Sequence, residues 1–243
     1  MSTRTRPSVP EPSKWCAVVT DVDGTLTDRD RRLDPNAVRV VRRLEAQGTP
    51  VVLATGNVLP IALALYRSLG LSGPIVAENG GIVYHRTDRG EDVVERLTDR
   101  RVALSAYRKL RASGLPVRRL FTDRWRESEV ALEPTVSVTR VRHALGSGSR
   151  VDVESTGYAL HLMETGGGKL PALVRALGYR GLAPRDCVIL GDGDNDVAML
   201  RAAGFGVSFA SASPRARHAA RYVTRAEFAA GFVEGLKASK ILD

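Results

Sequence analysis

Short apolar runs recur in the first and last thirds of the chain, and an amphipathic stretch follows most of them. Runs without polar alternation are typical of parallel strands that are buried on both faces. They occupy Cys16–Thr20, Val51–Ala54, Ile75–Ala77, Cys187–Leu190 and Gly206–Phe209. We therefore predict a buried strand at each of these positions.

Helical patterns lie between and after the predicted strands. Asp34 and Pro35 suit the N-cap and first position of a helix whose apolar stripe runs from Ala37 to Leu44 and which ends at Gly48. Further helices are expected at about 58–69, 169–177 and 195–202, after Pro214 and after Arg225. This alternation predicts a doubly wound parallel (Rossmann-like) α/β sheet, in which ligands bind beyond the carboxyl ends of the strands.

The middle of the chain has a different pattern. Segments that alternate apolar and polar residues, among them Ile82–His85 and Val151–Glu154, accompany two helical stretches. We interpret residues 82–163 as an α+β domain inserted into a sheet domain made of residues 15–81 and 164–243. Trp125 is expected in the core of the inserted domain. Residues 1–14, which are basic and contain three prolines, are expected to form a flexible tail.

Carboxylates follow two of the predicted strands directly. Asp21 and Asp23 come after the first strand, and Asp192 and Asp196 come after Cys187–Leu190. Because parallel strands end at one edge of a sheet, these groups are expected to converge and to repel one another unless a cation lies between them. Mg²⁺ is the natural ion for such oxygen ligands. An EF-hand calcium loop is excluded, because Val197 stands where that loop requires glycine.

Two further segments are candidates for binding phosphate. Thr55, Gly56 and Asn57 end the second strand, where a hydroxyl and backbone N–H groups can hold phosphate oxygens. Lys169 begins a helix after three glycines, and its compact ammonium suits a transferring phosphoryl group. A Walker phosphate loop is excluded, because Leu170 replaces its Ser/Thr.

The formal net charge of +9 indicates an anionic partner. The arginines are dispersed and aromatic residues make up only 5% of the chain, so a small anion is favoured over nucleic acid. The sequence has neither an apolar run of about 20 residues nor a secretory signal, which predicts a cytoplasmic protein without a membrane partner. Cys16 and Cys187 lie in apolar runs and are expected to be buried and unpaired.

Taken together, these residues resemble the haloacid dehalogenase superfamily of phosphohydrolases. Its four motifs match in order, as Asp21-Val22-Asp23-Gly24-Thr25, Thr55, Lys169 and Gly191–Asp196. The inserted domain resembles the superfamily's cap. Four longer segments are similar to the archaeal-type phosphoglycolate phosphatases: Thr55–Pro60, Glu78–Gly81, Thr122–Glu127 and Gly157–Met163. The resemblance implies a Mg²⁺-dependent phosphatase that hydrolyses 2-phosphoglycolate to glycolate and phosphate through an aspartyl-phosphate.

The same resemblance implies a role for each candidate residue. Asp21 is the nucleophile, and Asp23 is the general acid and then the general base. The metal is held by the Asp21 side chain, the Asp23 carbonyl and Asp192, with Asp196 as a ligand or close neighbour. The phosphoryl oxygens are bound by Thr55, Gly56, Asn57 and Lys169.

Substrate choice is expected to lie in the cap. Arg124 and Arg126 are candidates for binding the carboxylate of phosphoglycolate, since a guanidinium binds a carboxylate with two parallel hydrogen bonds. The alternative is a sugar-phosphate phosphatase or a phosphotransferase of the same superfamily. A nucleic-acid-binding protein and a non-catalytic anion-binding protein are less favoured, because neither requires the pair Asp21 and Asp23. The protein is expected to be a monomer or a homodimer.

Overall fold

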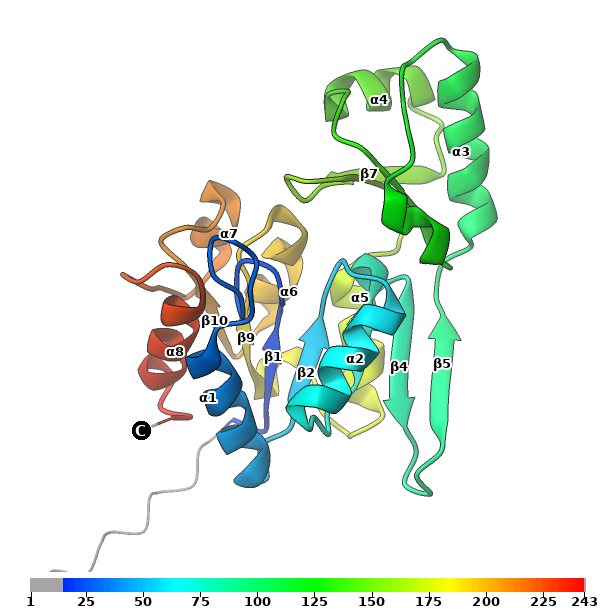
Figure 1. Ribbon diagram of the computed structural model, residues 1–243. Coiled ribbons are helices and arrows are strands. Elements are labelled where there is room, and N and C mark those ends of the chain that lie inside the picture. Colours follow the sequence, from blue (N-terminus) through cyan, green and yellow to red (C-terminus); the bar gives the residue numbers. More distant parts are fainter. Residues whose placement is uncertain (1–14, 243) are drawn as a thin grey trace, which may run out of the picture.

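The computed structural model describes residues 15–242, and the predicted tail, residues 1–14, lies outside the described residues. One sheet of eight strands forms the larger domain, in the order β11-β10-β9-β1-β2-β3-β4-β5. A smaller domain stands over the carboxyl ends of its parallel strands (Figure 1). We call the smaller domain the cap and the larger one the core.

The core sheet is parallel from β11 to β3 and antiparallel from β3 to β5. The strands are β1 (Ala17–Thr20), β2 (Val51–Ala54), β3 (Ile75–Ala77), β4 (Ile82–Arg86), β5 (Asp92–Arg96), β9 (Cys187–Leu190), β10 (Phe205–Ser208) and β11 (Tyr222–Val223). The residues of β1, β2, β3 and β9 are all buried, as their unbroken apolar runs predict.

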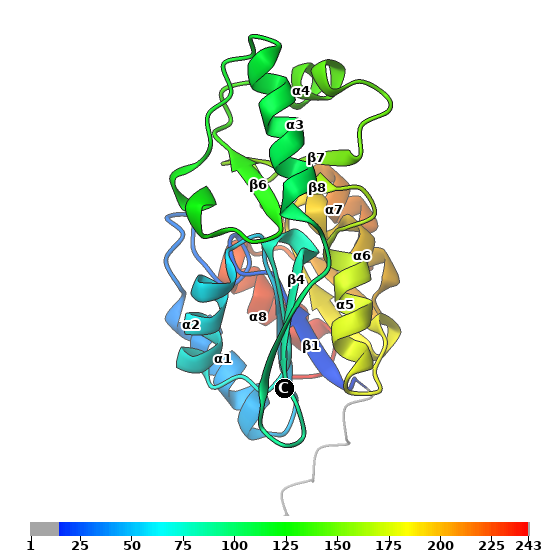
Figure 2. The same ribbon diagram turned by 90° about the vertical axis from the view of Figure 1, so that its right-hand side faces the viewer.

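Helices cover both faces of the core sheet (Figure 2). On one face lie α1 (Pro35–Ala46), α2 (Leu59–Leu69) and α8 (Phe228–Ala238), and on the other lie α5 (Lys169–Gly178), α6 (Val197–Ala202) and α7 (Pro214–Ala219). The carboxylate of Asp34 caps α1 by accepting hydrogen bonds from the N–H groups of Asn36 and Ala37. The predicted doubly wound α/β fold is confirmed.

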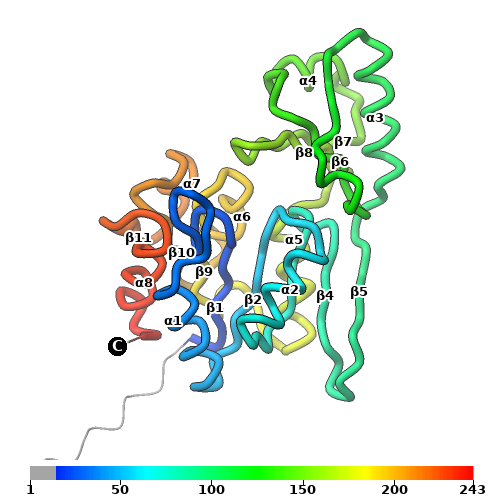
Figure 3. The backbone as a smooth tube through the Cα atoms, viewed as in Figure 1, coloured from blue at the N-terminus to red at the C-terminus, as the bar shows by residue number. Residues whose placement is uncertain are grey.

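The cap has a three-stranded antiparallel sheet and a hydrophobic core of its own. Its strands are β6 (Glu129–Leu132), β7 (Val151–Ser155) and β8 (Leu160–Glu164), and its helices are α3 (Arg100–Ala112) and α4 (Val138–Leu145). Both helices pack on this sheet, burying Leu110, Val141 and Leu162 among other side chains. Figure 3 shows that the chain enters the cap from β5 and returns from it into α5.

The boundary between core and cap differs from the predicted one. Residues 82–96 form β4 and β5, which extend the core sheet rather than the cap sheet. Their alternating pattern reflects a position near the edge of the core sheet, where β5 has exposed residues at every second position. The chain therefore leaves the core after Arg96, not after Gly81. Among the described residues, no helix combines the length and the apolar character that crossing a membrane requires.

Candidate active site

Strand register brings the predicted motifs to one edge of the core sheet. Thr20 at the end of β1 is level with Leu53 of β2 and with Leu190 of β9. The residues that follow these strands therefore lie side by side under the cap. Asp21, Thr55 and Gly191 each occupy the first or second position beyond a buried strand.

Three carboxylates and one ammonium form the floor of this site. Oxygen atoms of Asp21, Asp192 and Asp196 lie within 4.8 Å of one another. Lys169, the first residue of α5, is 3% exposed, and its Nζ donates to Asp21 Oδ1 and to Asp196 Oδ1, both at 2.7 Å. The second oxygen of Asp196 accepts from the N–H groups of Asp192 and Gly193 at 3.0 and 2.9 Å. Lys169 thus joins the loop after β1 to the loop after β9.

The pKa values at the floor follow from burial and from these contacts. Burial raises the pKa of Asp21 well above its ordinary value, although Lys169 opposes this effect. Burial and the neighbouring Asp196 raise the pKa of Asp192 to about 7. Burial by itself would lower the pKa of Lys169, but Asp196 and Asp21 more than compensate and raise it. Lys169 therefore stays charged, while the carboxylates need further positive charge to be fully ionised together.

The carboxylate cluster fits a small divalent cation. Its donors are all oxygens, which suits Mg²⁺. Gly24 packs so closely that an added Cβ would lie 2.3 Å from Asp192 Oδ2, and its φ of +77° also favours glycine. Any larger residue at this position would displace the Asp192 carboxylate from the cluster.

Asp23 lies beside the cluster and is held by two partners. Asn57 Nδ2 donates to Asp23 Oδ2 at 2.7 Å, and Arg31 Nη2 donates to Asp23 Oδ1 at 3.3 Å. Asn57 also donates through its backbone N–H to the hydroxyl of Thr55 at 3.1 Å. The structure therefore brings the predicted residues Thr55, Asn57 and Asp23 together, and it adds Arg31, which the sequence pattern did not single out.

A cleft of about 570 Å³ opens above these residues, between core and cap. Its core wall includes Asp21, Asp23, Gly56 and Asp192. Its cap wall is the turn between β7 and β8, residues 155–158, whose tip extends over the edge of the core in Figure 1. A ligand whose phosphate sits at Asp21 would therefore contact the cap through this turn.

A buried polar network joins the cap to the core behind the cleft. Glu78 accepts from the N–H groups of Glu127 and Ser128 and from the Ser128 hydroxyl. Glu129 forms an ion pair with Arg126 and a hydrogen bond with His161, whose Nδ1 lies 3.0 Å from Glu129 Oε1. Each of these residues except Glu127 is at most 3% exposed. Of these residues the sequence pattern singled out Arg126 alone, and it gave no signal for the network, because Glu78, the segment 126–129 and His161 lie far apart along the chain.

The structure separates the two arginines that were predicted to bind substrate. Arg126 is 3% exposed, and its Nη1 donates to the Gly56 carbonyl at 3.0 Å, so it reaches the loop that was predicted to bind phosphate. Arg124 instead lies over the Phe121 ring and lines a different cavity of the cap. The prediction that Trp125 lies in the cap core is wrong, because Trp125 is 46% exposed. It belongs to a short 3₁₀ helix, Phe121–Trp125, at the surface of the cap.

A family model for haloacid dehalogenase-like hydrolases matches residues 18–126 and 138–236, which include every loop of this site. The chain belongs to the haloacid dehalogenase-like hydrolase family. It is an enzyme of the hydrolase class, as the resemblance in its motifs implied.

Relatives from archaea support this membership. A phosphoglycolate phosphatase of Methanothermobacter thermautotrophicus is 38% identical over 91% of this chain and 97% of its own length. A phosphoglycolate phosphatase of Methanopyrus kandleri is 39% identical over 90% of this chain and 95% of its own.

Solved structures share the fold. The crystal structure of Thermoplasma acidophilum 0175 has a TM-score of 0.80 and 26% identity, and the match covers 93% of this chain and 98% of that one. A subclass IIB sugar phosphatase of the family has a TM-score of 0.74 and 18% identity, over 93% of this chain and 99% of that one. The similarity to the sugar phosphatase shows a shared fold and nothing about activity.

Proposed function

We propose that this hydrolase is a Mg²⁺-dependent phosphatase that converts 2-phosphoglycolate to glycolate and phosphate. The observation that carries the proposal is the contact of Lys169 with Asp21 at the floor of a cleft that the cap partly covers. A lysine there can neutralise phosphoryl charge while Asp21 attacks. Relatives that carry the name phosphoglycolate phosphatase, each matched over nearly its full length, support this choice of substrate.

In the first step, a carboxylate oxygen of Asp21 attacks phosphorus in line with the bond to the leaving oxygen. That bond breaks, an aspartyl-phosphate forms, and Asp23 gives its proton to the leaving alkoxide. In the second step, Asp23 takes a proton from water, and the water oxygen attacks phosphorus. The bond to Asp21 breaks, phosphate leaves, and the carboxylate is restored.

The remaining residues bind and orient the phosphoryl group. Lys169, the Thr55 hydroxyl and the backbone of Gly56 and Asn57 would surround this group. The contact of Lys169 with Asp21, the contact between Asn57 and Thr55, and the position of Gly56 in the cleft wall support this assignment. Asn57 also fixes the orientation of the Asp23 carboxyl. Mg²⁺ would be held by Asp21, Asp192 and the Asp23 carbonyl, with Asp196 beside it, and would neutralise phosphoryl charge.

A sugar-phosphate phosphatase is the alternative, and the fold alone is compatible with it. Arg126 does not line the cleft, and its guanidinium is buried against Glu129 and the Gly56 carbonyl, so we do not assign it to the substrate. Its proposed role is to hold the loop of Gly56 in place. Arg124, which lines a different cavity, is not assigned to the substrate either.

The test is phosphate release from 2-phosphoglycolate, hexose phosphates and p-nitrophenyl phosphate, with Mg²⁺ and then with EDTA. We expect phosphoglycolate to have the highest kcat/KM and EDTA to abolish turnover. The variant Asp21→Asn is expected to lose at least about four orders of magnitude in kcat while its circular dichroism spectrum stays unchanged. A preference for hexose phosphates would overturn the substrate, and an active Asp21→Asn variant would overturn the mechanism.

A further inference from the structure

Arg31 lies in a tight turn of the core loop that follows Asp23, and its backbone has an unusual conformation. The loop turns back tightly, with the N–H of Arg31 donating to the Asp28 carbonyl and the N–H of Asp28 donating to the Arg32 carbonyl. Arg31 itself has a φ of +64°, a left-handed conformation that side chains other than glycine rarely adopt. Such strain persists only where the surrounding structure fixes it, and it is concentrated at functional sites.

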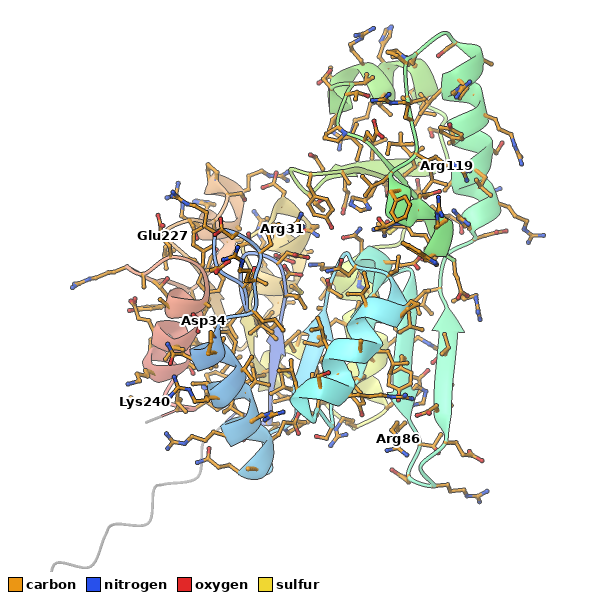
Figure 4. All side chains as sticks on the ribbon, viewed as in Figure 1. Arg31, Asp34, Arg86, Arg119, Glu227 and Lys240 are labelled. Carbon is orange, nitrogen blue, oxygen red and sulfur yellow. The ribbon has the colours of Figure 1, made fainter. Side chains whose placement is uncertain are left out.

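This turn directs the Arg31 guanidinium into the gap between core and cap (Figure 4). On the core side, Nη2 donates to Asp23 Oδ1 at 3.3 Å. On the cap side, the guanidinium carbon lies 4.2 Å from the centre of the Tyr158 ring. Asp23 and Tyr158 both line the cleft, and Arg31 bridges them with a side chain that is still 49% exposed.

In-line chemistry determines which part of a substrate would reach this position. The proposed nucleophile, Asp21, lies on one side of phosphorus, and the leaving oxygen lies on the opposite side. Since Asp23 protonates that oxygen, the leaving group must extend past Asp23. The groups that it meets there are Arg31 and Tyr158.

The charge of the cleft restricts what this position can hold. Asp21, Asp23 and Asp192 on its core wall would repel a leaving group that carries a carboxylate. Arg31 supplies a cation where the leaving group emerges, and its planar fork matches a carboxylate. Arg215 lines the cleft itself, whereas Arg31 lies beside it through its contacts with Asp23 and Tyr158. Arg215, however, forms an ion pair with Asp194 at 3.1 Å, and its side chain is 72% exposed.

From this geometry we infer that Arg31, supported by Tyr158, binds the carboxylate of the leaving group and so selects 2-phosphoglycolate over phosphate esters whose leaving group is uncharged. The assignment rests on the proposed function and deepens it. Arg31 is then a specificity-determining residue in the core, whereas the sequence pattern placed specificity in the cap. Stacking on Tyr158 holds the guanidinium in place before substrate arrives, which reduces the entropy lost on binding.

The experiment compares 2-phosphoglycolate with ethyl phosphate, which has a methyl group in place of the carboxylate. The variant is Arg31→Asn, because asparagine tolerates the left-handed conformation and so preserves the turn. Arg32→Asn is the matched control in the same turn, since the Arg32 side chain is 79% exposed and pairs only loosely with Asp30, at 3.9 Å. Circular dichroism and thermal unfolding establish that both variants fold.

We expect Arg31→Asn to lower the ratio of kcat/KM for phosphoglycolate to that for ethyl phosphate by about tenfold to hundredfold. The inhibition constant of glycolate should rise with it, and Arg32→Asn should change neither quantity more than about twofold. An unchanged ratio would overturn the inference, because a residue that only positions Asp23 affects both esters alike. Tyr158→Ala should shift the ratio in the same direction as Arg31→Asn.

The same measurements separate this inference from the proposed function. Wild-type enzyme that prefers hexose phosphates would contradict the substrate assignment, whatever Arg31→Asn does. Wild-type enzyme that prefers phosphoglycolate, with an unchanged ratio in Arg31→Asn, would contradict only the role of Arg31. A shifted ratio in Arg215→Asn but not in Arg31→Asn would assign the carboxylate to Arg215 and would also overturn the inference.

Discussion

Asn79 Nδ2 of the core donates to the two carboxylate oxygens of Glu129 in the cap, at distances of 3.3 and 3.2 Å. Both residues are fully buried, and Asn79 Oδ1 accepts in turn from Asn195 Nδ2 at 3.0 Å. The loop that contains the metal-binding candidates is thus connected to the cap through two side-chain contacts. A change at Glu129 therefore affects the arrangement of the two domains as well as local stability.

The first prediction concerns the charge of Glu129. Glu129→Gln keeps the shape but leaves Arg126 buried without a carboxylate, which we expect to cost about 3 kcal/mol. At about 2–4 °C per kcal/mol, the midpoint of thermal unfolding should fall by roughly 6–12 °C. The matched control is Glu127→Gln, whose pair with Arg96 is about half exposed and whose loss should cost less than about 1 kcal/mol. Equal effects of the two changes would contradict this account.

The second prediction concerns how the contribution of Glu129 to the stability of the fold depends on pH. Burial would raise the pKa of Glu129, but His161 and Arg126 outweigh it and lower the pKa below the ordinary 4.5. A carboxyl whose pKa is lowered by folding stabilises the fold at pH values above its pKa in the unfolded chain. This stabilisation is lost as the pH falls through the pKa of the carboxyl in the folded protein. Urea unfolding of wild type and Glu129→Gln should therefore differ most at neutral pH and converge below about pH 4.5. A difference that persists unchanged at pH values well below 4.5 would exclude the charge of Glu129 as its cause.

The third prediction concerns the carboxylate cluster. Burial and Asp196 raise the pKa of Asp192 to about 7, so at pH 8 its negative charge opposes folding when EDTA removes divalent cations. Asp192→Asn should raise the unfolding midpoint in EDTA and should abolish the further rise that Mg²⁺ gives the wild type. Asp194→Asn serves as the control, because Asp194 is exposed and pairs with Arg215. A Mg²⁺-dependent rise that survives in Asp192→Asn would exclude Asp192 as a ligand.

The fourth prediction concerns Arg124. Its guanidinium lies 4.3 Å from the centre of the Phe121 ring and lines a cavity of about 310 Å³ that shares no lining residue with the cleft. Arg124→Ala should therefore change the KM for phosphoglycolate by less than about twofold. A selective rise in that KM, without a rise for ethyl phosphate, would restore Arg124 as a substrate-binding residue.

The fifth prediction concerns the two thiols. Cys187 is buried, and burial raises its pKa to about 12, whereas Cys16 is exposed, in contrast to the prediction from its apolar neighbours. The native protein should release one equivalent of thionitrobenzoate from Ellman's reagent quickly, and the protein in guanidinium chloride should release two. Cys16→Ser should remove the fast equivalent. Two fast equivalents in the native protein would mean that β9 opens readily.

Sequence reasoning succeeded where a local pattern of apolar residues is compatible with only one kind of structure. Unbroken apolar runs such as Val51–Ala54 became buried parallel strands, and the polar residues after them converged because parallel strands end together. The pattern did not determine which sheet a strand would join. The alternation of Ile82–His85 suits either domain, and only the pairing of Ile82 with Ala77 assigns it to the core.

The unpredicted part of the site depends on conformation and on distant contacts. Arg31 became significant because its backbone is left-handed and its side chain meets Tyr158, which is far away in the sequence. Glu129 and His161 were likewise ordinary polar residues until the cap sheet placed them beside Arg126. No spacing rule in the sequence encodes such contacts.

The chain leaves the core and returns to it at almost the same point. The N–H of Asp99, just after β5, donates to Oε2 of Glu164, the last residue of β8, at 2.9 Å. A few residues of linker would therefore close the core if the cap were removed. A replacement cap would have to supply new partners for the buried Glu78 and Asn79 of the core. Transplanting a different cap at this junction would test how much of the selectivity lies in the core, because Asp21, the proposed nucleophile, and Arg31 would remain in place.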